Sequence, residues 1–163
     1  MIPGKKLSRR YFIRNVSLMS GALVLGCEIG VNKDEMKPLL SDGSFSPNLF
    51  VQLKPDGELI LTASRSEMGQ GVRTSLTSVI ADEMDADWSF VKVIQAPGDE
   101  AYGNQNTDGS RSIRTIFEPM RKMGAMAREM LIAAAANKWK VSKEACKTEM
   151  HYVVNTESGE RLV

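Results

Sequence analysis

The fold of this chain is set around the stretch SRSEMGQGV, residues 64–72. The preceding residues, Glu58 to Ala63 (ELILTA), are β-rich and predict a strand. In the following residues 73–84, Leu76, Val79, Ile80 and Met84 recur at helical spacing. The order is therefore strand, glycine-containing loop, helix.

This junction has the composition of a ligand-binding loop. Gly69 and Gly71 allow backbone to approach a ligand closely, and the following helix N-terminus presents unsatisfied N–H groups that favour an anion such as phosphate. Gln70, between them, can both donate and accept hydrogen bonds. The same pattern also suits an ordinary tight turn between a strand and a helix, and the pattern alone leaves both interpretations open.

Two further strands are predicted around this unit. Residues 49–53 alternate and are joined to residues 58–63 through Lys54-Pro55-Asp56-Gly57, a turn sequence, which predicts a hairpin. Residues 90–96 (FVKVIQA) predict the next strand and end at a Pro-Gly pair. Strand, helix and strand in succession indicate a βαβ unit or a mixed α+β sandwich.

A second candidate anion-binding loop, or cradle, like the one at residues 68–71, lies at the end of the loop of residues 99–112. The loop is long and polar, and Gly109, Ser110 and Ser112 stand where a second helix begins, in a place suited to anionic oxygens. The alternative is that Ser110 or Ser112 simply caps that helix. The helix is predicted over residues 113–140, with a kink or short break near Phe117 because Pro119 lies inside it.

The C-terminal part is predicted as a short helix over 142–146, a strand over Thr148–Asn155 and a returning strand at 161–163. So short a final strand pairs poorly, which suggests a chain cut short or a strand that pairs elsewhere. The expected fold class is α+β: a mixed sheet with two main helices packed on it, preceded by a signal segment.

The leader has a composition of its own. Residues 5–14 carry five basic and no acidic residues, and the uncharged run from Val16 to Cys27 follows them. This is the layout of a secretory signal, and the sequence SRRYFIR (residues 8–14) closely matches the twin-arginine export signal. Val24 to Cys27 resembles a lipobox, which predicts lipidation of Cys27; the alternative is an apolar signal region that happens to end in a cysteine. We therefore expect a signal over 1–27, a linker over 28–47, and a periplasmic or lipid-anchored product.

Overall composition excludes several classes. The 163 residues hold 21 basic and 20 acidic side chains, so bulk charge gives no reason to expect nucleic-acid binding. One histidine and two cysteines exclude a histidine-rich metal site and a disulfide scaffold. We expect His151 to pack or lie at the surface and Cys146 to act as a small buried side chain. Chemistry in this chain would therefore depend on a cofactor or on other polypeptide.

Several stretches together resemble a known family. They are EMGQGVRT (67–74), ADEMDADW (81–88), GSRS (109–112), RKMGAMAR (121–128) and the segment 133–139. The chain over residues 48–163 is thereby similar to the molybdopterin-binding large subunits of molybdenum hydroxylases, the xanthine dehydrogenase and aldehyde oxidase family, and in particular to β subunits of the isoquinoline 1-oxidoreductase type.

The resemblance implies a cofactor and partners. Met68, Gly69, Gln70 and Gly71 would contact the cofactor, and Gly109, Ser110 and Ser112 would bind the phosphates of molybdopterin cytosine dinucleotide. Arg111 would contact phosphate or only cover the site. The partners implied are the remainder of the large subunit and an iron–sulfur small subunit; a membrane would be reached only through a lipid anchor at Cys27.

The departures from the family limit the activity expected. Large subunits are several times longer, and their catalytic glutamate segment has no counterpart here, with Glu83 and Glu118 poor substitutes. We therefore expect no catalytic residue and no protein metal ligand, and an N-terminal portion, inactive alone, of an enzyme that hydroxylates N-heterocycles or aldehydes. The rivals are a non-enzymatic exported binding module and one piece of a split hydroxylase.

Overall fold

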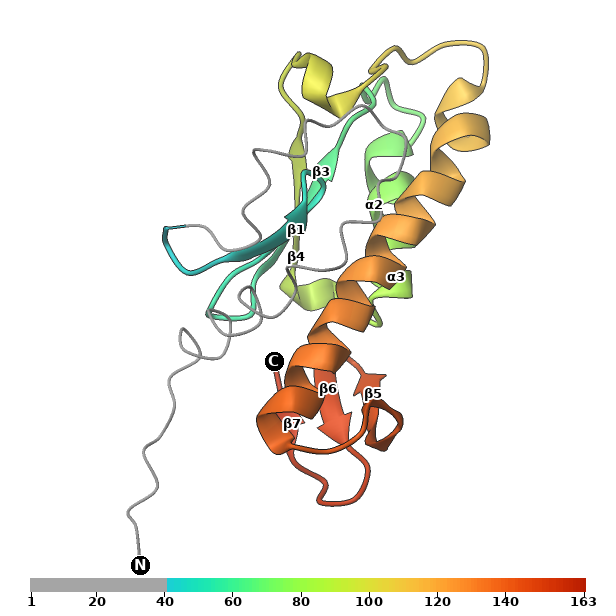
Figure 1. Cartoon of the computed structure of the whole chain (residues 1–163). Coiled ribbons are helices and arrows are strands. Elements are labelled where there is room, and N and C mark those ends of the chain that lie inside the picture. Colours follow the sequence, from blue (N-terminus) through green and yellow to red (C-terminus); the bar gives the residue numbers. More distant parts are fainter. Residues whose placement is uncertain (1–40) are drawn as a thin grey trace, which may run out of the picture.

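The computed structural model describes residues 41–163 and contains two sheets and two long helices (Figure 1). The strands are β1 (Phe45–Asn48), β2 (Val51–Leu53), β3 (Leu59–Ala63), β4 (Val91–Gln95), β5 (Cys146–Glu149), β6 (Tyr152–Asn155) and β7 (Arg161–Leu162). The α-helices are α2 (Val72–Glu83) and α3 (Arg111–Trp139), and the 3-10 helices are η1 (Trp88–Phe90), η2 (Glu100–Tyr102) and η3 (Lys143–Ala145). The predicted export signal and most of the predicted linker lie outside the described residues.

The first sheet confirms the predicted hairpin and βαβ unit. Its strand order is β1-β2-β3-β4, with β2 antiparallel to β3 and β4 parallel to β3. Helix α2 makes the crossover between the two parallel strands, which is the connection that a parallel pair requires. The sheet is therefore mixed, and both the loop after β3 and the loop after β4 leave it at the carboxyl ends of neighbouring strands.

Strand β1 forms where the sequence predicted part of an irregular linker. It pairs antiparallel with β2, and its first residue, Phe45, is 1% exposed. The strand lies at the edge of the sheet, where Pro47 removes no ladder hydrogen bond from an inner strand. One buried aromatic residue among polar neighbours thus extends the folded part upstream of residue 48.

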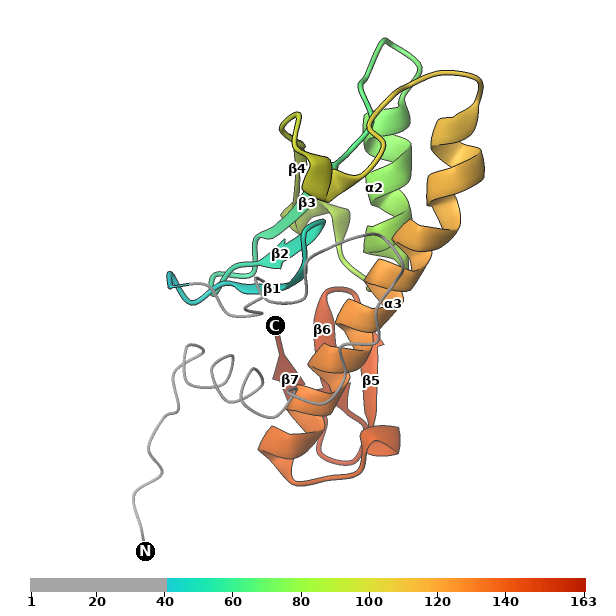
Figure 2. The same ribbon diagram turned by 45° about the horizontal axis from the view of Figure 1, so that its top comes forward.

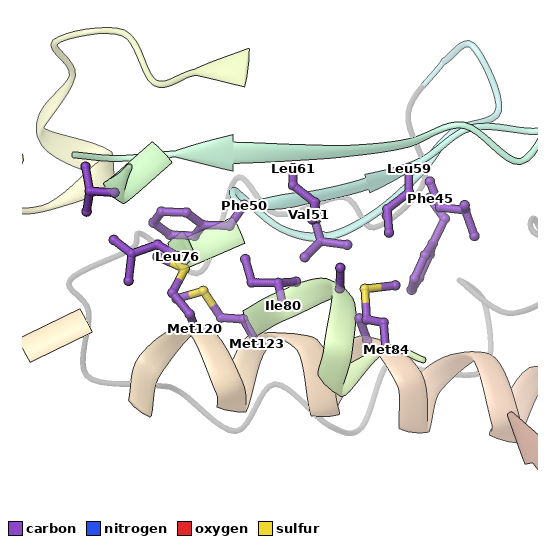
Figure 3. Packing of buried hydrophobic residues seen from close by; sticks show 14 residues of the cluster. Phe45, Phe50, Val51, Leu59, Leu61, Leu76, Ile80, Met84, Met120 and Met123 are labelled. Carbon is purple, nitrogen blue, oxygen red and sulfur yellow. The ribbon is translucent and has the colours of Figure 1, made fainter. Parts of the chain in front are cut away.

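The main core lies between the first sheet and the two helices. Leu59 and Leu61 of β3 pack toward Leu76 and Ile80 of α2, and Met120 and Met123 of α3 complete the layer (Figure 3). All six side chains are buried, and each methionine fills space between neighbours rather than facing a ligand. The expected arrangement of two helices on a mixed sheet is confirmed.

Helix α3 is continuous through Pro119, so the short break, one of the two alternatives predicted near Phe117–Glu118, is absent. A proline within a helix removes one N–H donor, but here the helix on both sides is held by packing against α2. Farther along, a Cβ on Gly124 would lie 2.7 Å from the carbonyl oxygen of Ile80. This contact confirms that the small residues of α3 admit another element at very close range, and that element is α2.

A second sheet, β5-β6-β7, packs beside the C-terminal half of α3 (Figure 2). The single strand predicted over Thr148–Asn155 is wrong, because Met150 and His151 turn the chain with φ angles of 44° and 75°. The strand predicted at 161–163 is confirmed as β7, which pairs antiparallel with β6. Cys146 is buried and free, as expected of a small packing side chain.

His151 joins this second sheet to the first. Its ring stacks on Phe90 with centroids 4.6 Å apart, its Nε2 lies 2.8 Å from the Gly57 carbonyl oxygen, and its N–H donates to the Asp85 carbonyl. The histidine therefore has a packing role, as predicted. In the part of the chain that the structure describes, neither helix is long and apolar enough to span a bilayer.

Candidate functional site

The two predicted cradles meet at one end of the molecule. The loop after β3 leads into α2 and the loop after β4 leads into α3, and both helix N-termini lie at that same end (Figure 1). Between them lies a hollow of about 400 Å³, a volume within the usual range of ligand pockets. It is lined by Met68, Gln70, Val72, Ser75, Thr107, Asp108, Gly109, Ser110, Ser112 and Ile113.

The hollow brings together five of the seven residues predicted for the site. Met68 and Gln70 line it from the first loop, and Gly109, Ser110 and Ser112 line it from the second. Gly69 and Gly71 belong to the first loop but are not among the lining residues. A Cβ on either would meet open space, so their requirement for glycine comes from φ angles of 95° and 79°, and not from crowding.

The backbone donors of the first loop are already satisfied by a side chain of the same loop. One carboxylate oxygen of Glu67 accepts from the N–H groups of Gly69 (2.7 Å) and Gly71 (2.9 Å). The other accepts from the N–H of Arg73 at 3.0 Å. These hydrogen bonds, that from Arg73 foremost, hold the pKa of the Glu67 carboxyl below its usual range.

Gln70 also bonds within its own loop. Its side-chain oxygen accepts from the N–H of Met68 at 2.6 Å, and its amide nitrogen donates to the Ser66 carbonyl at 3.1 Å. Since a carboxamide has two donor hydrogens and two acceptor lone pairs, half of its capacity remains for a ligand. Met68, in contrast, is 70% exposed and offers an apolar side chain at the rim of the hollow.

The second cradle has no such internal partner. Ser110 occupies the N-cap position of α3 in the left-handed conformation and makes no side-chain cap hydrogen bond, so the alternative of capping by Ser110 is wrong. Ser112 is buried in the first turn. Arg111 donates to the Asp108 carboxylate through two nitrogens, one of them at 2.9 Å, so its side chain is held by a residue of the same loop. Helix α3 therefore presents its N-terminus to the hollow without a side-chain cap.

Arg65 and Thr107, for which the sequence predicted no role, connect the two loops. Arg65, 3% exposed, donates to the Asn104 side chain (3.1 Å) and to the Asn106 carbonyl, while its Nε has no hydrogen-bond partner. Thr107 donates to the Ser66 carbonyl at 3.0 Å. Burial, with Arg111 nearby as a second positive charge, lowers the pKa of Arg65. The two loops thus form one structural unit.

The role of Glu67 was also not predicted, although the sequence contains a signal for it. An acidic residue just ahead of a helix is placed to meet its unsatisfied N–H groups, so Glu67 could have been assigned to the α2 N-terminus from its position alone. Arg65 offers no comparable signal, because a single arginine at the end of a strand is ordinary until its burial is known.

The remaining glutamates considered in the sequence do not face the hollow. Glu83 bonds Arg121 at 2.6 Å and so ties α2 to α3, and Glu118 lies 3.9 Å from the same arginine. Within residues 41–163, no group of three or more His, Cys, Asp or Glu side chains could hold a metal ion. The lining of the hollow combines hydroxyl and backbone donors with the apolar side chains of Met68, Val72 and Ile113, which suits an organic ligand that carries anionic groups.

A family comparison agrees with this geometry. Residues 20–162 match the molybdopterin cofactor-binding domain, and the chain belongs to that family. The matched region includes both loops and the hollow between them, and it begins within the segment expected to be an export signal.

Individual relatives are oxidoreductases or their subunits. The beta subunit of isoquinoline 1-oxidoreductase from Brevundimonas diminuta is 32% identical over 94% of this chain and 20% of its own length. A membrane-bound aldehyde dehydrogenase (pyrroloquinoline-quinone) of Gluconacetobacter polyoxogenes is 32% identical over 86% of this chain and 18% of its own. A subunit of nicotinate dehydrogenase from Pseudomonas putida is 30% identical over 54% of this chain and 7% of its own. The chain thus spans about a fifth of the length of the first two of these curated relatives.

A solved structure shares the fold. The crystal structure of quinoline 2-oxidoreductase from Pseudomonas putida 86 aligns with a TM-score of 0.54, covering 66% of this chain and 14% of that one, at 23% identity. The likeness supports the arrangement of the sheet and helices.

Proposed function

We propose that this chain forms part of the pocket for molybdopterin cytosine dinucleotide in an exported molybdenum hydroxylase. One observation carries the proposal: the two loops predicted to contact that cofactor line a single hollow of about 400 Å³. The residues that line the hollow fit this cofactor, because they offer hydroxyl groups and the backbone around Gly109, and their one carboxylate, that of Asp108, is paired with Arg111.

Each part of the hollow has a role in this proposal. Gly109, Ser110 and Ser112 would hold the phosphates, since the uncapped start of α3 offers N–H groups and hydroxyls to anionic oxygen. Met68 would cover an apolar face of the ligand, and Gln70 would use its remaining hydrogen-bonding capacity. When bound, the cofactor supplies the redox chemistry, and the chain orients it.

The complete enzyme would hydroxylate an N-heterocycle or an aldehyde and would pass electrons to an iron–sulfur subunit. The proposal draws on relatives that are named as subunits or oxidoreductases, of whose length this chain covers only a part. The chain alone would be inactive, because it would supply only part of the pocket, and export would follow the twin-arginine route, ending in the periplasm or at a lipid anchor on Cys27.

The cofactor proposal is tested by chemical analysis of the full chain. We expect the purified protein, produced with the remainder of a relative's large subunit, to retain molybdenum and a pterin, and acid hydrolysis to release cytidine monophosphate. Gly109→Val should reduce retention, while Gly98→Val, a change on a glycine outside the hollow, should not. Recovery of pyrroloquinoline quinone in place of a pterin would overturn the assignment.

The inactivity of the chain alone is tested by assay. Purified residues 1–163, with molybdenum and pterin content measured beside it, should give no hydroxylation of isoquinoline or of an aldehyde above background. Turnover by this chain in the absence of other polypeptides would refute the expectation that it needs a larger subunit.

A further inference from the structure

The carboxylate of Glu67 is the point on which the first loop converges. It accepts from three backbone N–H groups, those of Gly69, Gly71 and Arg73, at 2.7, 2.9 and 3.0 Å. These donors span the loop and the first turn of α2. A single side chain therefore fixes both the glycine conformations and the start of the helix.

Helix α2 has no other cap at this end. Its N-cap is Gly71, which offers no side-chain acceptor, and its first turn contains no acidic residue. An unsatisfied helix N-terminus attracts negative charge, and Glu67 supplies that charge from the preceding loop.

Backbone amides are the partners of the Glu67 charge. Among the ion pairs within residues 41–163, none involves Glu67, and its side chain lies in an exposed loop. The N–H groups of Arg73 and Gly71 lower its pKa, so the carboxylate stays charged to a lower pH than that of an ordinary glutamate. The place that the glycine loop offers to an anion is therefore filled by the protein itself.

The loop that Glu67 holds also shapes the hollow. Gln70 and Met68 lie between the anchored glycines, and Ser66, one residue before Glu67, accepts hydrogen bonds from both Gln70 and Thr107 of the second loop. Displacement of Glu67 would release Met68 and Gln70 from their positions on the hollow and would loosen the junction with the second loop.

We propose that Glu67 is a positioning residue: it acts as an internal anion that holds the 66–73 loop in its ligand-binding shape and excludes an external anion from the N–H groups of Gly69 and Gly71. The inference rests on the proposed function, and it reassigns the two glycines from direct contact with the cofactor to shaping the loop. Anionic groups of the ligand are left to the second loop, around Gly109.

The test is nuclear magnetic resonance of the ¹⁵N-labelled full chain, with Glu67→Gln as the variant and Glu129→Gln as the control. Glu129 is an exposed residue of α3, so the control removes the same charge outside the site. In the wild-type chain, the amide signals of Gly69, Gly71 and Arg73 should titrate together with an apparent pKa below the ordinary 4.5 of a glutamate. The titration should vanish in E67Q and persist in E129Q.

Cytidine 5′-diphosphate serves as the probe of the site. It should shift the amides of Gly109 and Ser110 in the wild-type chain and leave those of Gly69 and Gly71 in place. E67Q should bind it about tenfold more weakly, because a loosened loop populates the competent shape less often. The amides of Leu61 and Ile80 report whether the core of E67Q stays folded. If it does not, the titration of the Gly69, Gly71 and Arg73 amides in the wild-type chain tests the role of Glu67.

The outcomes separate the two claims. Amides of Gly69 and Gly71 that do not titrate, that titrate unchanged in E67Q, or that shift with the probe as strongly as Gly109 would overturn the role of Glu67. Failure of the wild-type chain to bind the probe would count against the proposed function, while the titration would still judge Glu67.

Discussion

The loop before α2 and the loop before α3 occupy equivalent places in the fold but satisfy their helices differently. In the first, Glu67 fills the N–H groups of the glycine turn and of the helix start. In the second, Ser110 stands at the helix start without a side-chain cap hydrogen bond. Two loops that look alike in sequence, each a glycine-containing turn leading into a helix, can therefore differ in whether a side chain of the loop satisfies the N–H groups of the helix start.

The largest expected effect comes from removing the link between the loops. Arg65→Ala should lower the free energy of unfolding by about 2 kcal/mol, because it deletes charged hydrogen bonds to Asn104 and Asn106 from a buried position. Denaturant unfolding measures the loss, and hydrogen exchange should show faster exchange in residues 103–110 than in 66–73. Arg65→Lys keeps the charge but lacks the branched guanidinium group, so its free energy of unfolding should lie between those of the wild type and Arg65→Ala. Equal stability of all three proteins would contradict this role.

A smaller effect should have opposite signs in the two loops. Gly71→Ala should destabilise by about 1 kcal/mol, since φ is 79° there, and Ser110→Gly should stabilise by about 0.5 kcal/mol by relieving a left-handed serine at φ 55°. Thermal or urea unfolding would show both changes. Gly98→Ala, at a glycine whose φ is not in the left-handed range and whose surroundings are open, serves as the neutral control.

The smallest effect concerns acid and salt. The pKa values of Glu67 and Asp108 are both lowered, that of Glu67 by backbone N–H groups and that of Asp108 by Arg111. Each therefore stabilises the protein above its ordinary pKa, and the contribution is lost as the pH falls through the lowered value. At about 1 M salt, where screening acts over about 3 Å, the pKa of Asp108 should rise more than that of Glu67. Carboxyl carbon titrations would compare them, and equal shifts would contradict the distinction.

The regular elements were predictable because their signals are local. Strand β3, helix α2 and strand β4 follow directly from alternation and helical spacing. The turn at Met150 and His151 was missed because the segment contains none of the Gly, Pro or Asn residues that mark a turn, and long-range contacts of His151 with Phe90 and Gly57 accompany it. Pro119 predicted a kink or a short break, and α3 is continuous there, with Met120 and Met123 buried just beyond the proline.

That the two candidate loops come together was predictable from the sequence, whereas the hydrogen bonds within and between them were not. The glycines and serines mark both loops, and five of the seven predicted residues line one hollow. The contribution of Arg65 depends on burial, and that of Glu67 on three N–H groups which converge only once Gly69 and Gly71 adopt positive φ. Neither condition can be read from residue types alone.

The close contact at Gly124 has a consequence for the distant hollow. Gly124 lies 13 residues beyond the start of α3, which corresponds to about 20 Å along the helix axis. If this contact acts as the pivot between α2 and α3, a change of about 5° in their crossing angle would move the start of α3 by about 2 Å, by the same helix geometry. A side chain larger than hydrogen at residue 124, which would push the two helices apart, would then change the hollow from a point far from any residue that lines it.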